Sequence, residues 1–163
     1  MQNVQSYNTA ISRKRASAPL RYLEDKGYLK GSVLDYGCGK SADFNHLKKA
    51  GYIAEAYDPY WRPIDISNMD FDTVLCTYVL NVVNAEAEAE ILRSIKSLLR
   101  KGGQAFITVR RDVKKDGKTS RGYQRNVRLD LNVVKENSGY CIYSLSSETP
   151  TDLDKGGIHA GHT

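Results

Sequence analysis

One short segment, VLDYGCGKSADF at residues 33–44, combines an acidic side chain with two glycines in front of a predicted helix. Because glycine has no side chain, the backbone at Gly37 and Gly39 can approach a ligand closely. A strand that ends in such a turn is typical of nucleotide-type cofactor sites, although a tight turn that binds nothing is the simpler alternative. Asp35 stands at the end of the strand, where its carboxylate can hold the ammonium group of a cofactor that carries an amino acid.

A second acid follows at the distance that cofactor binding requires. Asp58 lies 19 residues after Gly39, at the end of the next apolar run, where a carboxylate can accept hydrogen bonds from both hydroxyls of a ribose. NAD stays open as a cofactor, because Gly37, Gly39 and Ala42 also satisfy its GxGxxA fingerprint. The short chain and Asp35 favour a cofactor that carries an amino acid.

These side chains need a framework, and the alternation of apolar strands with helical patterns predicts an α/β sheet. Strands are expected at 33–36, 53–57, 73–77 and 105–109, and helices at 43–50 and 85–100. A helical region at 9–26 precedes them and is expected to be interrupted near Pro19.

The pattern changes after residue 109. A charged, glycine-containing segment leads to two expected strands, NVRLDL at 126–131 and YCIYSL at 140–145, which we expect to pair antiparallel. Residues 149–163 lack periodicity and are expected to form a mobile tail. We predict a single domain at 1–148, with an N-terminal helical region at 1–30.

Composition fits one domain in the cytoplasm. The chain has 163 residues, of which 40% are hydrophobic, enough for one core. Cys38, Cys76 and Cys141 lie far apart, without the spacing of a zinc site, and no metal is predicted. The first residues lack the apolar core of a signal peptide, and no run approaches the about 18 apolar residues of a membrane span. The sequence does not indicate an oligomeric state.

The excess of basic residues, a net charge of +5, is compatible with a nucleic-acid partner. One basic group, at 13–15, precedes the sheet, and a larger one follows the strand at 105–109. Both are expected at the carboxyl ends of the strands, where open α/β sheets bind ligands. Tyr123 adds a ring on which a base can stack, although solvated surface is the usual role of such charge. The predicted nucleic-acid-binding residues are Arg110, Arg111, Lys114, Lys115, Lys118, Arg121 and Arg125.

Four segments taken together resemble the ordered motifs of class I S-adenosylmethionine (SAM)-dependent methyltransferases. They are VLDYGCGKS at 33–41, AYDPY at 56–60, FDTVLCTYVLNVV at 71–83 and LLRKGGQAFITV at 98–109. The resemblance implies a Rossmann-like, mostly parallel sheet that ends in an antiparallel strand pair. More narrowly, NTAISRKRASAPLRYL at 8–23 with the segments that follow is similar to methyltransferase-like proteins of DNA phosphorothioation islands and to related phage proteins.

The resemblance implies SAM as the cofactor and assigns its binding residues. Those at the glycine turn would meet the methionine end, Asp58 the ribose, and the two residues after Asp58 the adenosine, while the end of the strand at 73–77 would border the donor methyl group. The implied cofactor-binding residues are Asp35, Gly37, Cys38, Gly39, Asp58, Pro59, Tyr60, Cys76, Thr77 and Tyr78.

Two departures from the family pattern stand out. Ser41 replaces the third glycine, and only 12 residues separate Asp58 from Phe71, where the family usually has a helix and a strand. The sheet is therefore expected to be shortened between the second and fourth family strands. The segment WRPIDISNM at 61–69 is a candidate to close the adenine pocket, with Trp61 and Met69 over the ring and Asp65 or Asn68 near its amino group.

Several segments are compatible with a catalytic role. DPYW at 58–61 is similar to the DPPY/W signature of adenine-amino methyltransferases, but it follows the second strand instead of the fourth. Cys76 lacks an activating base and is expected to be a core thiol. Tyr78 and Asn81 remain as catalytic candidates, and Asn81 is equally compatible with a helix cap.

The sequence therefore predicts a SAM-dependent methyltransferase that acts on a nucleic acid or nucleotide. The alternative is a protein of the same fold that binds SAM or nucleic acid without transferring a methyl group, since no clear catalytic acid or base is present. An NAD-dependent reductase is disfavoured by the length of the chain.

Overall fold

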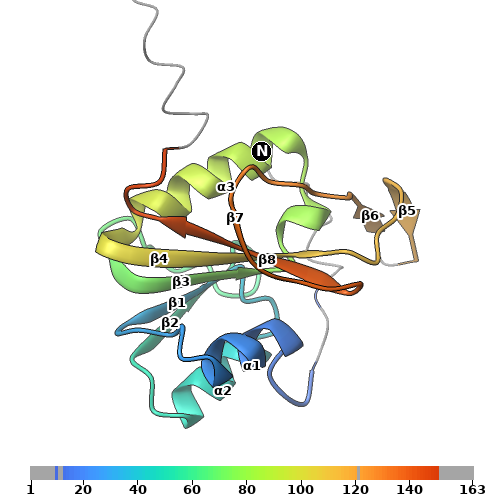
Figure 1. Cartoon of the computed structure of the whole chain (residues 1–163). Coiled ribbons are helices and arrows are strands. Elements are labelled where there is room, and N and C mark those ends of the chain that lie inside the picture. The colour runs from blue at the N-terminus through green and yellow to red at the C-terminus, as the bar shows by residue number, and fades with distance from the viewer. Residues whose placement is uncertain (1–9, 11–12, 121, 151–163) are drawn as a thin grey trace, which may run out of the picture.

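Six strands form one sheet in the order β2-β1-β3-β4-β8-β7 (Figure 1). The computed structural model describes residues 10, 13–120 and 122–150. Neighbouring strands among β1 (Val33–Tyr36), β2 (Ala54–Tyr57), β3 (Phe71–Thr77) and β4 (Leu99–Arg110) are parallel. Two antiparallel strands, β8 (Tyr140–Ser146) and β7 (Asn132–Glu136), complete the sheet. The predicted Rossmann-like fold class, with its terminal antiparallel pair, is confirmed, and no strand intervenes between β2 and β3.

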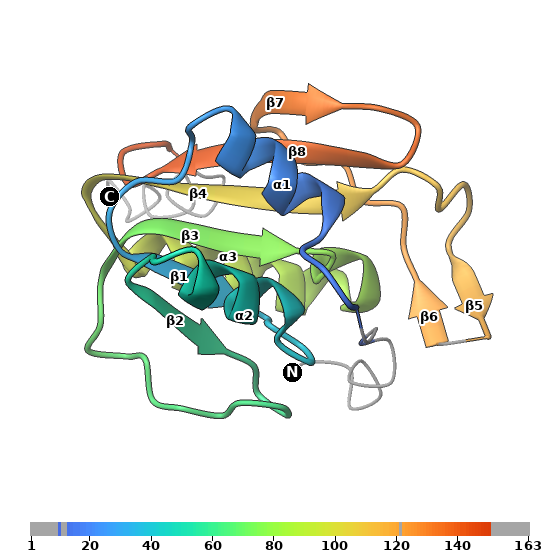
Figure 2. The same cartoon turned by 90° about the horizontal axis from the view of Figure 1, so that it is seen from below.

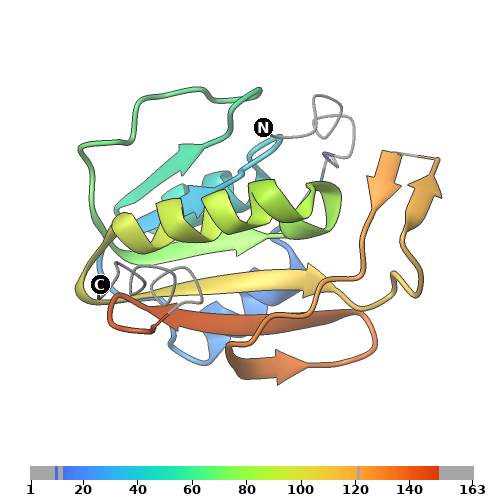
Figure 3. The ribbon, with the colours of Figure 1, turned by 90° about the horizontal axis from the view of Figure 1, so that it is seen from above.

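Helices cover both faces of the sheet. The helices α1 (Ala18–Asp25) and α2 (Ala42–Lys49) lie on one face (Figure 2), and α3 (Ala85–Ser97) lies on the other (Figure 3). Each face has its own apolar cluster, and all four residues of β1 are buried, as expected for a parallel strand enclosed by two layers. A short 3₁₀ helix, η2 (Leu80–Val82), follows β3.

The helix bounds correct two expectations. Pro19 does not interrupt α1; it lies in its first turn, where its missing N–H costs nothing, and Ser17 caps the helix. The helix expected to reach residue 100 ends at Ser97, because β4 already begins at Leu99, which pairs with Phe71.

The prediction of a strand at 126–131 is wrong, although the antiparallel pair is present as β7 and β8. The strand β7 lies immediately after residues 126–131, and the alternating Val127, Leu129 and Leu131 pack against the core without joining a ladder. A hairpin that was not predicted, β5 (Gly117–Thr119) with β6 (Gly122–Gln124), projects past the end of β4 (Figure 3). Of the expected tail, 151–163 lies outside the described residues, and Thr149 is hydrogen-bonded to Ser146.

Candidate active site

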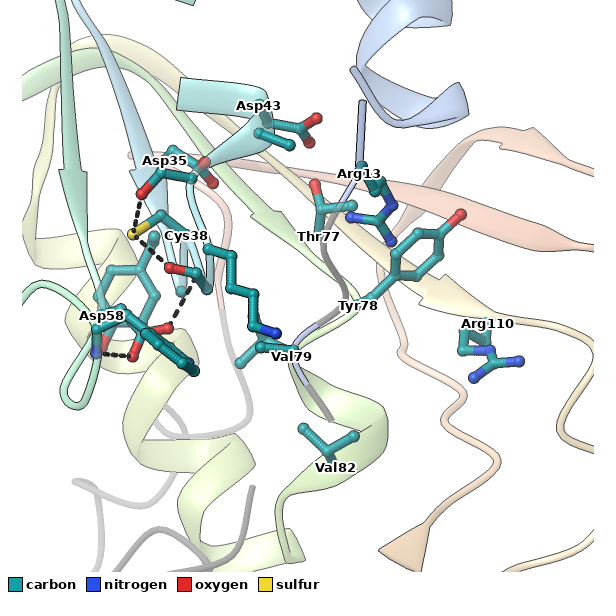
Figure 4. A pocket seen from close by; sticks show the side chains of 18 of the residues that line it. Arg13, Asp35, Cys38, Asp43, Asp58, Thr77, Tyr78, Val79, Val82 and Arg110 are labelled. Atoms are coloured by element: carbon teal, nitrogen blue, oxygen red, sulfur yellow. Dashed lines mark hydrogen bonds between the residues drawn. The ribbon is translucent and has the colours of Figure 1, made fainter. Parts of the chain in front are cut away.

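A cavity of about 690 Å³ lies at the carboxyl ends of the parallel strands (Figure 4). Its walls come from the ends of β1, β3 and β4 and from the turns after β1 and β2, the edge where open α/β sheets bind ligands. The cavity brings together most of the residues singled out from the sequence: Asp35, Gly37, Cys38, Gly39, Asp58, Pro59, Tyr60, Thr77, Tyr78 and Arg110.

The glycine turn is fastened to the end of β2. The backbone N–H groups of Gly37 and Cys38 donate to the carbonyl of Tyr57, at 2.7 and 3.0 Å. Both glycines have positive φ, 80° at Gly37 and 51° at Gly39, which other residues rarely adopt. A Cβ on Gly37 would lie 2.4 Å from Cγ2 of Val79. The turn therefore presents backbone to the cavity and has no room for a side chain at Gly37.

Asp58 joins this turn to the next one. Its Oδ2 accepts a hydrogen bond from the N–H of Gly39 at 3.0 Å, and its Oδ1 accepts from the N–H groups of Tyr60 and Trp61, both at 2.9 Å. A carboxylate has about four acceptor positions, so these three bonds leave about one for a ligand hydroxyl. Asp58 thus fixes both walls around the expected ribose position.

Asp35 is buried below the glycine turn in a group of acids. Burial, with repulsion from Asp43 and Asp58, raises the pKa of the Asp35 carboxyl well above its usual range. Asp43, in the first turn of α2, accepts hydrogen bonds from the N–H and the hydroxyl of Ser17, both at 2.7 Å. The cavity therefore contains a carboxyl that stays protonated more readily than usual, and a nearby cation would favour its ionised form.

The segment before α1 also reaches the cavity, which the sequence did not reveal. Ala10 and Arg13 line it, and the guanidinium of Arg13 lies 5.5 Å from the centre of the Tyr78 ring. The bonds between Ser17 and Asp43 hold the start of α1 against the start of α2 and so place Arg13 above the pocket. Nothing in the sequence around Arg13, which is one of three successive basic residues, indicates that it lines a cavity.

At the end of β3, some residues face the cavity and others face the core. Thr77 and Tyr78 line the cavity, and Tyr78 has φ = 61°, an unusual conformation for a tyrosine that functional sites often contain. Cys76, expected to border the donor methyl group, is fully buried in the cluster beneath α3. Because side chains alternate along a strand, Cys76 faces away from the cavity, and burial raises the pKa of its thiol.

Asn81 lies outside the cavity lining and binds backbone instead. Its Oδ1 accepts from the N–H of Arg110, and its Nδ2 donates to the carbonyl of Arg125, both at 2.8 Å. The cap of α3 is Asn84, whose side chain accepts from the N–H of Ala87. Neither predicted role of Asn81, catalytic residue or helix cap, matches this position.

The predicted nucleic-acid interface separates into two groups. Arg111 and Arg125 are partly buried and bind groups of the fold: Arg111 donates to the Val127 carbonyl and the Tyr143 hydroxyl, and Arg125 to the Leu80 and Val83 carbonyls and Glu88. Their side chains are only 6% and 16% exposed, so both stabilise the fold instead of facing a ligand. The prediction that Arg111 and Arg125 bind nucleic acid is therefore corrected.

The remaining basic residues surround the open side. Lys114, Lys115 and Lys118 are exposed in and beside the β5–β6 hairpin. Arg110 lines the cavity and forms a bidentate pair with Asp112, which raises the pKa of the arginine and lowers that of the aspartate. Arg121 lies outside the described residues.

The opposite end of the cavity is aromatic. Tyr60 and Trp61 line it, their rings pack edge to face, and the Lys40 ammonium lies 5.5 Å from the centre of the Trp61 ring. Met69, Asp65 and Asn68, expected near the adenine, are not among the lining residues. The Asp65 carboxylate accepts hydrogen bonds from Ser67 instead.

The described residues contain no cluster of three or more potential metal-ligating side chains. Within the same residues, no helix has the length and apolar character needed to cross a membrane. The predicted cytoplasmic location stays a prediction.

The chain is similar in fold to solved structures of low sequence identity. A SAM-dependent methyltransferase from Bacteroides fragilis, in complex with S-adenosylhomocysteine (SAH), superposes with a TM-score of 0.58 at 17% identity, covering 82% of this chain and 78% of that one. The Burkholderia thailandensis 1,6-didemethyltoxoflavin-N1-methyltransferase, with SAH bound, gives 0.57 at 19% identity and covers 78% and 76%. A structure solved in connection with the conversion of a disulfide bond into a thioacetal group during echinomycin biosynthesis gives 0.53 at 21%; the match covers 61% of this chain and 55% of that one.

No curated protein matches the chain. A family model described as a methyltransferase domain matches residues 7–146, which include every described residue of the cavity lining. This match confirms the predicted enzyme class, a SAM-dependent methyltransferase, with SAM as its cofactor. The narrower resemblance to proteins of DNA phosphorothioation islands stays a prediction. Because the model spans most of the sequence, the chain belongs to the methyltransferase domain family.

Proposed function

We propose that the chain transfers the methyl group of SAM to a nucleic acid or nucleotide. The observation that carries the choice of acceptor is the position of Lys114, Lys115 and Lys118. They are exposed in and beside the β5–β6 hairpin, whose last residue, Gln124, lines the cavity, as does Asp112 before the hairpin. Cations at the mouth of a site attract phosphates and hold a polyanion in register.

The residues present fit SAM. The backbone of Gly37 and Gly39 lines the cavity, where the methionine part can approach it, and Asp35 lines the same cavity, where ionisation would pair it with the SAM ammonium group. The acceptor position left on Asp58 suits a ribose hydroxyl, and the Trp61 ring offers a surface for adenine. When bound, SAM supplies a methyl carbon on a cationic sulfur; the acceptor lone pair forms the new bond, the sulfur keeps the electrons of the broken one, and SAH leaves.

The chain contributes position more than acid–base chemistry. The phenol of Tyr78 is protonated near neutral pH, as that of an ordinary tyrosine is, and burial raises its pKa further, so it can donate a hydrogen bond. Figure 4 shows the Tyr78 ring between Cys38 and Arg110. Alignment of the acceptor with the methyl group accounts for much of the rate in such reactions, and a proton released by the acceptor can leave through the open mouth.

A second candidate function is SAM binding without methyl transfer. The observation in its favour is that three of the four carboxylates described in the cavity lining are already engaged, and the fourth, Asp35, is the expected partner of the SAM ammonium group. Asp112 pairs with Arg110, Asp43 binds Ser17, and Asp58 accepts from three backbone N–H groups. None of these is an available general base, although attack by a neutral nitrogen lone pair does not need one.

Incubation with methyl-labelled SAM decides between the two functions. The acceptors would be single-stranded DNA, duplex DNA, RNA and the four nucleoside monophosphates, with a Gly37→Val variant as the inactive control. Label in a nucleic acid or nucleotide supports the proposal. Binding of SAM without label in any acceptor supports the second candidate and contradicts the first.

A further inference from the structure

The side chain of Gln124, at the end of β6, is the least explained polar group of the cavity. Gln124 lines the cavity but is only 5% exposed, and its Oε1 has no hydrogen-bond partner among the described residues. Buried polar atoms nearly always have a partner in the protein or in something bound to it. The amide therefore points to a ligand that supplies a hydrogen bond when it enters this part of the cavity.

The backbone beside Gln124 is held firmly. The next residue, Arg125, exchanges two backbone-directed bonds with Asn81: its N–H donates to the Asn81 carbonyl at 2.7 Å, and its carbonyl accepts from Asn81 Nδ2 at 2.8 Å. The Arg125 guanidinium also binds the Leu80 carbonyl and Glu88. A binding group on such a support keeps its orientation, which specific recognition requires.

The surroundings of Gln124 suit a flat ring. Val82 and Val83 supply apolar walls, and the phenol rings of Tyr78 and Tyr140 line the same cavity. Figure 4 places Tyr78, Val82 and Arg110 away from Asp58, which marks the ribose position. Aromatic and apolar side chains bind the faces of a planar ring, while polar groups at its rim read the edge.

An amide has a carbonyl that accepts and an NH₂ group that donates, and the two lie side by side. This pairing complements the edge of a nucleobase, on which a donor and an acceptor are also adjacent. Arg110 lies near this end, because Asn81 accepts from its N–H and donates to the Arg125 carbonyl. Its guanidinium is already paired with Asp112, so the Gln124 amide is the polar group that an acceptor has to satisfy.

We propose that this end of the cavity is a nucleobase subsite, in which the Gln124 amide hydrogen-bonds to the edge of the base that receives the methyl group. This rests on the proposed function and makes it narrower: the acceptor atom belongs to a base, not to a phosphate or sugar. A base in a duplex must leave the helix to reach the pocket, so single-stranded substrates are favoured.

The test uses the full chain saturated with SAH and the nucleosides adenosine, guanosine, cytidine and uridine as probes. Ligand-detected NMR gives their affinities for the wild type, for Gln124→Leu and for Gln104→Leu. Gln104 is the matched control, because it is an exposed glutamine of β4 outside the cavity. We expect at least one nucleoside to bind the wild type and the control alike, and Gln124→Leu to lose tenfold or more of that affinity. SAH affinity should stay within twofold in all three.

A second measurement tests the nucleobase subsite even if the Gln124→Leu variant does not fold. In the wild-type complex with SAH, the side-chain amide NMR signal of Gln124 should shift on addition of the nucleoside that binds, and the signal of Gln104 should not. Unchanged Gln124 signals, or equal affinities for both variants, would overturn the nucleobase subsite. If labelled methyl still reaches nucleic acid in that case, the proposed function stands alone; if SAH does not bind at all, both are wrong.

Discussion

Asn81 and Arg125 bind each other through both backbone groups of Arg125, with the Asn81 carbonyl accepting its N–H and the Asn81 amide donating to its carbonyl. Since Asn81 also accepts from the N–H of Arg110, one buried side chain links η2, the end of β4 and the end of β6. The open side of the cavity is built on this link.

Replacing Asn81 with leucine should therefore destabilise the fold. The change leaves the Arg110 N–H and the Arg125 carbonyl without partners, at a cost of about 2–4 kcal/mol in the free energy of unfolding. Asn84→Ala, which removes only the cap of α3, should cost about 1 kcal/mol. Urea unfolding measures both, and equal losses would show that the Asn81 bonds add nothing beyond an ordinary cap.

Asp58→Ala should weaken SAM binding by about 1.5–3 kcal/mol, the scale of hydrogen bonds to a charged group. The variant loses the ribose partner and also frees the N–H groups of Gly39, Tyr60 and Trp61. Isothermal calorimetry gives the affinity. An unchanged affinity in a folded Asp58→Ala protein would exclude Asp58 from the cofactor site.

Gly37→Ala should reduce binding more than an ordinary glycine substitution. A Cβ at this position would collide with Val79 and also meets a φ of +80°. Gly51→Ala is the control, because its φ of +90° imposes the same kind of backbone cost, about 1–2 kcal/mol, with nothing within 4 Å. We expect loss of SAM binding in the first variant and wild-type affinity in the second; similar affinities would refute the close approach at Gly37.

SAM affinity should rise as the pH increases through the titration of Asp35, below the usual pKa of an α-ammonium group. Because burial raises the pKa of Asp35, the free protein holds a proton there up to a higher pH than an ordinary aspartate does. Pairing with the cofactor ammonium favours the ionised carboxylate, so binding releases that proton and strengthens as pH rises. Calorimetry in two buffers of different ionisation enthalpy gives the number of protons released when SAM binds. The Asp35→Asn variant should release no proton. Wild-type binding without proton release would contradict the pairing.

Neutralising Lys114, Lys115 and Lys118 together should weaken nucleic-acid binding. Each lost phosphate contact lowers the slope of log affinity against log salt by about one unit, so up to about three are expected. A triple change of Lys26, Lys49 and Lys101, exposed residues outside the cavity lining, alters net charge equally. Filter binding across a salt series compares the two, and equal slopes would mean that net charge alone attracts the ligand.

The sequence predicted those parts of the molecule that local patterns encode. The end of β1, the glycine turn and Asp58 lie within short motifs, so their shared position followed from strand order alone. The prediction of a strand at 126–131 failed because apolar and polar residues also alternate where an extended segment packs on a core without pairing. The strand β7, by contrast, is an exposed edge strand with a mostly polar sequence. Edge strands need only one apolar face, which weakens their signal.

The rest of the cavity depends on contacts between distant segments. Arg13, Gln124 and Tyr140 reach it only through tertiary folding, and no spacing in the sequence marks them. Arg111 and Arg125 were misassigned for the same reason, because charge does not reveal whether an arginine faces water or buried carbonyl groups. The long apolar stem and five donors of arginine suit both positions.

A crystal structure of the chain with SAH tests the cofactor site most directly. We expect the amino-acid end of SAH beside Asp35 and the glycine turn, a ribose hydroxyl within hydrogen-bond distance of the Asp58 carboxylate, and the sulfur facing Tyr78, with the space beside Gln124 left open. SAH bound elsewhere, or a cavity that stays empty at SAH concentrations in the millimolar range, would contradict the assignment of this cavity as the methyl-donor site.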